Sequence, residues 1–235
     1  MKKSILILFT VLISFVTHSQ TSIDYKSSGF IKLEAGDFTG AIADFTKAIQ
    51  LNPTDVDAYN SRGVAKAQLG DFSGAIADFT KVLQLNPTDK TAYSNRGAAK
   101  EQLGDYIGAI GDLTKAIQID SSDAGSYFNR SIVKVKLEDF RGAIVDCTKA
   151  IELNPTFVGA YVMRGVAKGQ LEDYKSAIAD FTKAIAIDVL CVDAYVNRGL
   201  ARVVIGEKDS GCLDLSKAGE LGDPRAYQHI KTYCN

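Results

Sequence analysis

The chain has 235 residues, of which 46% are hydrophobic and 23% are charged. This globular composition excludes wholesale disorder, a collagen-like structure and a small disulfide-rich scaffold. The 27 basic and 28 acidic residues give a formal net charge of -1, whereas a general nucleic-acid binder needs clustered positive charge. The two histidines, His18 and His229, leave little imidazole for hydrolytic or metal chemistry.

The first residues have the pattern of an export signal. A basic head at residues 1–3 precedes an apolar run that continues to Val16. This run of about a dozen residues is shorter than the roughly 20 that a bilayer-spanning helix needs, and with its basic head it is typical of a secretory signal peptide. Small residues at Thr17 and Ser19 favour cleavage after Ser19. We expect residues 1–19 to be a signal peptide and the mature chain to be periplasmic or secreted, with no integral membrane segment; the alternative is a buried N-terminal helix.

The rest of the chain repeats one pattern every 34 residues. The segment GDFTGAIADFTKAIQLNPTD begins at Gly36, and GDFSGAIADFTKVLQLNPTD begins at Gly70. A fixed period of this length predicts a solenoid in which each unit contacts only its neighbours. We place six units at residues 22–55, 56–89, 90–123, 124–157, 158–191 and 192–225, and a C-terminal capping helix at residues 226–235.

Each unit is predicted to contain two helices. Apolar residues of the second unit recur at steps of three and four along its second helix: Phe72, Ala75, Ile76, Phe79, Val82 and Leu83. Gly70 suits the left-handed residue that ends the first helix, and Asp71 is the expected N-cap of the second. Asn86 precedes Pro87 and so ends that helix. The sequence therefore predicts an all-α stack of antiparallel helix-turn-helix hairpins.

These residues resemble the tetratricopeptide repeat family, which has the same 34-residue period. Its spaced aromatic, glycine, alanine, aromatic and proline positions are matched in the second unit by Tyr59, Gly63, Ala75, Phe79 and Pro87. The resemblance covers about nine-tenths of the chain. It implies a right-handed superhelical solenoid of the exported bacterial type that serves as a protein-protein interaction scaffold.

Charged residues form three columns with one member per unit. The first is Arg62, Arg96, Arg130, Arg164 and Arg198; the second is Lys32, Lys66, Lys100, Lys134, Lys168 and Arg202; the third is Asp44, Asp78, Asp112, Asp146, Asp180 and Asp214. These columns either grip a ligand or pair with one another between hairpins. We favour the structural interpretation, because columns this uniform serve every unit alike, whereas ligand contacts usually differ from unit to unit.

In the tetratricopeptide repeat family the first helices line a concave groove that holds extended peptides or partner segments. The resemblance places in this groove Asn60, Gln68, Ser94, Asn95, Gln102, Phe128, Asn129, Met163 and Asn197. Amide side chains form hydrogen bonds with a peptide backbone whatever the amino-acid sequence of the peptide. The sequence thus favours an exported scaffold that binds a peptide or partner helix of unknown identity. The alternative interpretation of these residues is a solvated helix face.

Two other functions stay open at this stage. The same groove would suit a non-protein ligand such as a glycan or cell-wall fragment, with Phe128 as the main candidate for an exposed aromatic platform. In the other interpretation, the groove binds no ligand and the solenoid self-associates through its ends. We expect no catalytic site, metal or cofactor, because the sequence has no CxxC pair, metal-ligand spacing, phosphate-binding loop or nucleophile elbow.

The cysteines occupy different positions in the repeat pattern. Cys147 takes the place of a phenylalanine column and is expected to be a buried apolar residue. Cys191 lies in a turn. Cys212 lies on the last full helix and Cys234 on the helix expected to pack against it, so an oxidising compartment would allow a disulfide between them. The alternative is two buried free thiols.

Overall fold

The computed structural model describes residues 21–234, so the expected signal peptide at residues 1–19 lies outside the described residues. Residues 21–234 form thirteen helices and no strand. The helices are α1 (Ser22–Glu34), α2 (Phe38–Leu51), α3 (Val56–Gln68), α4 (Phe72–Leu85), α5 (Lys90–Gln102), α6 (Tyr106–Ile119), α7 (Ala124–Lys136), α8 (Phe140–Leu153), α9 (Val158–Gln170), α10 (Tyr174–Ile187), α11 (Val192–Val204), α12 (Lys208–Glu220) and α13 (Pro224–Tyr233). The prediction of an all-α repeat solenoid is confirmed.

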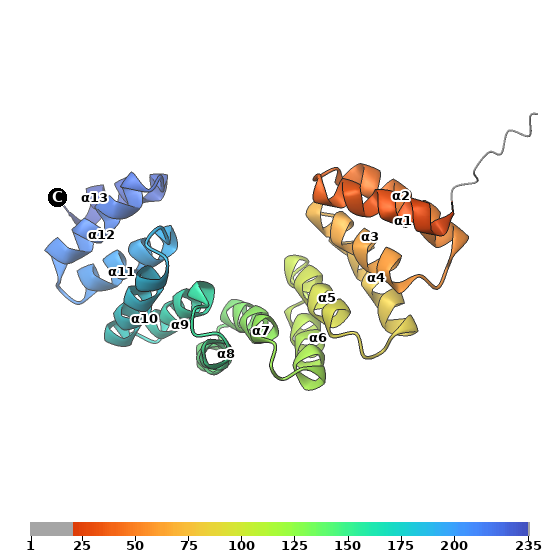
Figure 1. Ribbon diagram of the computed structural model, residues 1–235. Coiled ribbons are helices and arrows are strands. Elements are labelled where there is room, and N and C mark those ends of the chain that lie inside the picture. The colour runs from red at the N-terminus through yellow and green to blue at the C-terminus, as the bar shows by residue number, and fades with distance from the viewer. Residues whose placement is uncertain (1–20, 235) are drawn as a thin grey trace, which may run out of the picture.

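The helices form one curved stack. Each helix packs against the next along the chain, and the first helices of neighbouring pairs also contact one another. Figure 1 shows two arms joined by a bend, with α5 and α7 on the inner side of the bend and α6 and α8 on its outer side. Buried apolar side chains form separate clusters along the stack instead of one central core. The inner side is therefore built from first helices.

Local sequence explains where each helix begins and ends. The Asp71 side chain accepts a hydrogen bond of 2.9 Å from the Gly74 amide at the start of α4, which satisfies one of the free amides of a helix N-terminus. Gly70 has φ of +80° in the turn before it. The fourth and fifth hairpins make the same turn with Glu138 and Glu172, at φ of 59° and 62°. A glutamate pays a steric cost there that glycine avoids.

Small residues let the two helices of a pair approach closely. A Cβ atom added to Gly63 would lie 2.8 Å from Cε1 of Phe79, nearer than side-chain atoms pack. Ala75 of α4 is fully buried in the same cluster as Phe79, and Ala58 and Ala65 of α3 are fully buried in the cluster with Phe45 of α2. The small residues of α3 thus leave room for the aromatic ring of α4, which explains why the repeat pattern alternates small and large positions.

The C-terminal helix caps the stack. Helix α13 begins at Pro224 instead of the expected position 226. The preceding helix α12 has 13 residues where the other five second helices have 14, and Asp223 caps α13 through the Arg225 amide. Ala226 is fully buried against α12. Cys212 and Cys234 form a disulfide that ties the end of α13 to α12.

Candidate functional site

The charged columns pair with one another inside the stack. The Arg130 guanidinium donates hydrogen bonds of 2.8 and 2.7 Å to the two carboxylate oxygens of Asp146. It donates a third bond of 3.0 Å to Thr114 Oγ1 of the preceding pair, and it lies 5.8 Å from the ring centre of Tyr127. The Lys134 ammonium lies 2.7 Å from the same carboxylate. Asp146 therefore has two cations, and Arg130 joins neighbouring hairpins.

The same arrangement recurs along the chain. The equivalent arginine-to-aspartate pairs are Arg62–Asp78, Arg96–Asp112, Arg164–Asp180 and Arg198–Asp214. In the first pair of helices a serine stands in for the arginine, and Ser28 Oγ donates to Asp44 Oδ2 at 2.6 Å. The structural interpretation of the columns is confirmed. Since these charges neutralise one another between helices, they are not available to grip a ligand in the groove.

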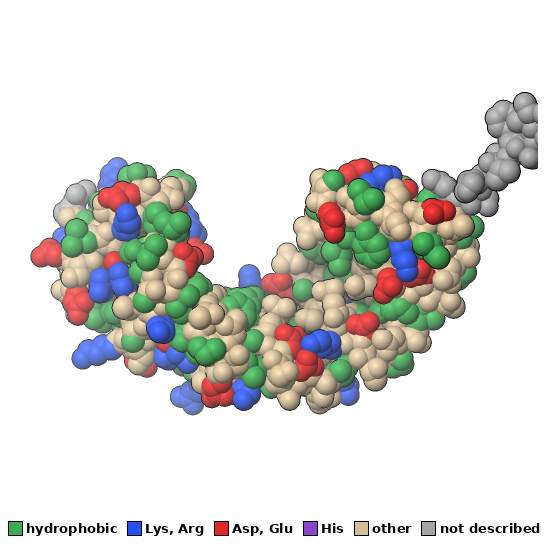
Figure 2. All heavy atoms as spheres, in the orientation of Figure 1, with side chains coloured by type: hydrophobic (Ala, Val, Ile, Leu, Met, Phe, Trp, Pro, Cys, Tyr) green, Lys and Arg blue, Asp and Glu red, His purple; other side chains and the backbone are tan. Residues whose placement is uncertain are grey.

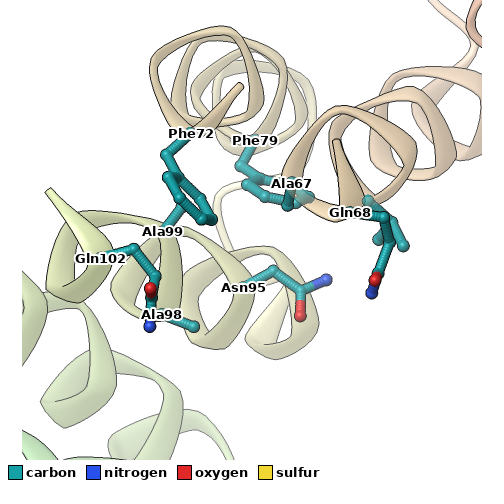
Figure 3. A pocket seen from close by; sticks show the side chains of 9 residues that line it. Ala67, Gln68, Phe72, Phe79, Asn95, Ala98, Ala99 and Gln102 are labelled. Carbon is teal, nitrogen blue, oxygen red and sulfur yellow. The ribbon is translucent and has the colours of Figure 1, made fainter. Parts of the chain in front are cut away.

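A cavity of about 190 Å³ opens between α3, α4 and α5, and we call it the N-terminal pocket. Its lining residues are Val64, Ala67, Gln68, Phe72, Phe79, Asn95, Ala98, Ala99 and Gln102. Figure 3 shows two phenyl rings reaching from α4 between α3 and α5, with the amides of Gln68, Asn95 and Gln102 on the other side of the pocket. The structure thus brings together three of the residues that the sequence places in the groove.

A second cavity, of about 270 Å³, lies between α9, α10 and α11, and we call it the C-terminal pocket. Its lining residues are Gly165, Val166, Gly169, Gln170, Tyr174, Ala177, Phe181, Asn197, Leu200, Ala201 and Val204. Every lining position of the N-terminal pocket recurs here 102 residues later, which is three repeat periods. The two pockets are equivalent places in the solenoid.

Between the two pockets the groove is shallower. A cavity of only about 50 Å³ lies between α5 and α7, and it is lined in part by Glu101 and by Asn129, another residue expected in the groove. Glu101 occupies the repeat position that is Ala67 in the N-terminal pocket and Gly169 in the C-terminal pocket. Small residues at this one position therefore mark the places where the groove deepens.

The other expected groove residues line none of these three cavities. Ser94 and Met163 are partly exposed on their helices. The side-chain oxygen of Asn60 is buried and has no hydrogen-bond partner in the described structure. The Phe128 ring packs against Phe157, with ring centres 4.8 Å apart. Phe128 is therefore part of a packed aromatic pair and does not stand free as a platform for a sugar.

Sequence reasoning missed the pocket floors. It assigned the phenylalanine column to internal packing alone, and Phe79 is indeed almost fully buried. The same ring nevertheless forms the wall of the N-terminal pocket, because the neighbouring Ala67 is too small to cover it. A change to alanine or glycine at that repeat position is the signal that would have found both pockets.

Three family models match parts of the chain, and all three describe the same kind of repeat. A model described as TPR repeat matches residues 29–70, and two described as tetratricopeptide repeat match residues 56–89 and residues 124–157 and 158–188. Together they cover more than half of the chain. The chain belongs to the tetratricopeptide repeat family.

Solved tetratricopeptide repeat structures share its fold. The chain is similar to MamA, with a TM-score of 0.65 and 27% identity over 72% of this chain and 92% of MamA. It is also similar to YrrB, described as a TPR protein with an unusual peptide-binding site (TM-score 0.63, 24% identity, 80% of this chain and 97% of YrrB). It is similar as well to pilF of Pseudomonas aeruginosa, with a TM-score of 0.77 and 16% identity over 90% of this chain and 96% of pilF. The last two similarities concern the fold alone. A search of curated protein sequences finds no match.

The rest of the described chain adds no other kind of site. Within residues 21–234 no helix has the length and apolar character needed to cross a membrane. The same residues include no cluster of three or more His, Cys, Asp or Glu placed to hold a metal ion. Cys147 is buried, and this burial raises the pKa of its thiol to about 11. The groove is therefore the candidate site that the geometry supports best.

Proposed function

We propose that this tetratricopeptide repeat protein binds an extended peptide or a partner helix in its concave groove and acts as a protein-interaction scaffold. The observation that carries the proposal is the N-terminal pocket, which combines an aromatic floor with the amides of Gln68, Asn95 and Gln102. Apolar surface binds a side chain of the partner, and amides exchange hydrogen bonds with its backbone.

The size of the pockets supports a side chain as their occupant. Cavities for small molecules and cofactors usually measure about 300–1,000 Å³, whereas the two larger pockets here measure about 190 and 270 Å³. The hollow between the two arms in Figure 2 is continuous, so one segment of a partner has room to lie along it. The similarity to YrrB, itself described as having a peptide-binding site, is consistent with this function. Tetratricopeptide repeat proteins are typically scaffolds without catalytic activity.

A peptide-display selection against the purified chain tests this proposal. Selected peptides are then measured against Ala98→Arg, which places a long side chain at the N-terminal pocket. Ala179→Arg is the matched control, because Ala179 is exposed on the second helix α10 and lines neither pocket. We expect Ala98→Arg to weaken binding at least tenfold and Ala179→Arg to leave it unchanged. Equal affinity for both variants would refute binding in the groove.

We also propose that the chain is exported to the periplasm or the medium. The basic head and apolar run of residues 1–19 support this, and so does the disulfide between Cys212 and Cys234, since disulfides persist in oxidising compartments. The test is N-terminal sequencing of the chain after cell fractionation. Export predicts a new N-terminus at Gln20 outside the cytoplasm, and recovery of an intact Met1 in the cytoplasm would contradict it.

A further inference from the structure

We infer that the groove is bipartite: the N-terminal and C-terminal pockets bind two apolar side chains of one extended, uncharged peptide segment. The inference rests on the proposed function and names the chemistry of its partner. It follows from four observations, namely the shared floor of the pockets, the residues that open them, the lack of charge inside them and their separation.

Both pockets offer the same kind of floor. Phe72 and Phe79 form the aromatic wall of the N-terminal pocket, and Tyr174 and Phe181 occupy the equivalent positions in the C-terminal pocket. The rest of each lining is alanine, valine, leucine or glycine, apart from Gln68, Asn95 and Gln102 in one pocket and Gln170 and Asn197 in the other. An aromatic floor with an amide rim suits a Leu-sized or Phe-sized side chain whose flanking backbone bonds to the rim.

One repeat position decides where the pockets open. It is alanine at 67 and glycine at 169, but the other four first helices of the repeats have Leu33, Glu101, Val135 and Val203 there. A Cβ atom added to Gly169 would meet no other atom within 4 Å, so it would project into open space. Gly169 is the second-last residue of α9, and glycine has a lower helix propensity than alanine. A side chain at position 169 would narrow the pocket, so Gly169 keeps the pocket open although it makes the helix less stable.

The two larger pockets carry no charge; between them lie Glu101 and the exposed Lys136, which occupies the repeat position of Gln102 and Gln170. Among the residues that line the three cavities in the described part of the chain, Glu101 is the one charged side chain, and it accepts a 2.7 Å hydrogen bond from Gln102. The lysine, arginine and aspartate columns are paired between helices instead. A charged side chain would lose hydration inside either of the two pockets without gaining a partner of opposite charge there. The fitting occupant is an uncharged segment.

The separation of the pockets suits one peptide. Neighbouring first helices contact one another along the groove, and axes of packed helices lie 8–10 Å apart, so three repeats span roughly 24–30 Å. An extended chain rises about 3.3–3.6 Å per residue and covers this length with roughly seven to nine residues. A single strand of ordinary length therefore reaches from one pocket to the other.

Synthetic peptides of defined pattern test the inference. The probes are capped, uncharged 16-residue peptides of Ser, Thr and Asn that carry either one leucine or two leucines separated by 4 to 12 residues. Affinity is measured by fluorescence anisotropy at low and high salt. We expect two-leucine peptides near the predicted spacing to bind on the order of 100-fold more tightly than one-leucine peptides, because the second contact is intramolecular.

Pocket-filling variants separate binding from folding. Gly169→Leu fills the C-terminal pocket and Ala67→Leu the N-terminal pocket, and each is expected to remove the advantage of the second leucine while one-leucine binding persists. Gly111→Leu is the matched control, because Gly111 lies on the exposed side of α6 and an added Cβ there also meets nothing within 4 Å. Both glycine replacements favour the helix, so loss of folding does not explain a difference between them.

Three results would overturn the bipartite groove: two-leucine peptides that bind no better than one-leucine peptides at every spacing, equal effects of Gly169→Leu and Gly111→Leu, or affinity that falls steeply with salt. The proposed function fails separately, when no displayed peptide distinguishes Ala98→Arg from Ala179→Arg. Displayed peptides that respond to Ala98→Arg but ignore Gly169→Leu would keep the groove and reject its second pocket.

Discussion

Replacing Arg130 by alanine is expected to destabilise the middle of the solenoid by about 3 kcal/mol, because breaking a buried ion pair leaves an uncompensated charge. The substitution removes two hydrogen bonds to Asp146 and one to Thr114, so it acts on α7, on α8 and on the preceding hairpin at once. It also removes the stacking of the guanidinium on Tyr127.

The magnitude follows from the burial of the carboxylate. The Asp146 side chain is only 2% exposed, and removing one partner of a buried pair typically costs about 3–5 kcal/mol. Lys134 stays 2.7 Å from the same carboxylate, which places the loss at the lower end of this range. The exposed Arg141 on α8 provides a control, because surface substitutions usually change stability by about 0.5 kcal/mol or less.

Two measurements check this prediction. Urea unfolding followed by circular dichroism gives the change in the free energy of unfolding. Amide hydrogen exchange shows whether protection falls first in α7 and α8, as expected for a stack of nearest-neighbour contacts. The triple variant Arg130→Met, Lys134→Met and Asp146→Leu should recover most of the loss. It replaces the whole buried charge cluster by apolar side chains, which is often neutral, and leaves no ammonium without its carboxylate.

The reasoning is refuted if Arg130→Ala changes the free energy of unfolding no more than Arg141→Ala does. It is also refuted if stability is untouched while binding of groove peptides disappears, because Arg130 would then be a ligand contact. A triple variant no more stable than Arg130→Ala would mean that the packing of Arg130, and not its charge, supports the stack.

Three further predictions concern the turn, the C-terminal cap and acid stability. Glu138→Gly should stabilise the chain by about 0.5–1 kcal/mol, because Glu138 has φ of 59° and glycine takes this conformation without steric cost; urea unfolding measures the gain. Reducing the disulfide, or replacing Cys212 and Cys234 by serine, should cost about 3 kcal/mol for a loop closed across 22 residues and should unprotect α13 in hydrogen exchange. The hydrogen bond from Lys90 holds the pKa of Asp120 below its ordinary value of 3.8. The ion pair of Asp120 with Lys90 therefore stabilises the folded chain at neutral pH, and this stabilisation is lost as the pH falls below 3.8. The difference in Tm between wild type and Asp120→Asn should shrink in acid for this reason.

Each of these predictions has an outcome that contradicts it. A Glu138→Gly variant less stable than wild type would show that glutamate makes a contact worth more than its backbone strain. An unchanged Tm in the presence of reductant would mean that the disulfide does not support α13. A difference between wild type and Asp120→Asn that stays constant from pH 7 to pH 2 would rule out a contribution from the ion pair with Lys90.

Much of the fold was predictable because each repeat has the same pattern of capping, turn and apolar residues. Asp71 caps α4 and Gly70 ends the turn before it as their positions in the pattern indicate. The pairing of the charged columns was also predictable, because it serves every hairpin alike. The start of α13 was placed two residues late, since α12 is one residue shorter than the other second helices and the turn after it, residues 221–223, is one residue shorter than the turn at residues 188–191.

The candidate site was predictable only in part. Gln68, Asn95 and Gln102 line the same pocket, but Phe128 packs on Phe157. A repeat pattern states which residues lie on the helix face toward the groove. It does not state how far a neighbouring side chain covers them, because coverage depends on the volumes of residues that adjoin across two or three helices.

The sequence by itself determined the period, the helix-turn-helix unit and the stack, because these arise from contacts within 34 residues that recur along the chain. The tertiary structure decided which repeats open toward the groove. The substitutions at Ala67 and Gly169 are small changes in a helical pattern, and they acquire meaning only where α4 and α10 place aromatic rings behind them. A gap in packing is a property of several helices together, so no single stretch of sequence contains it.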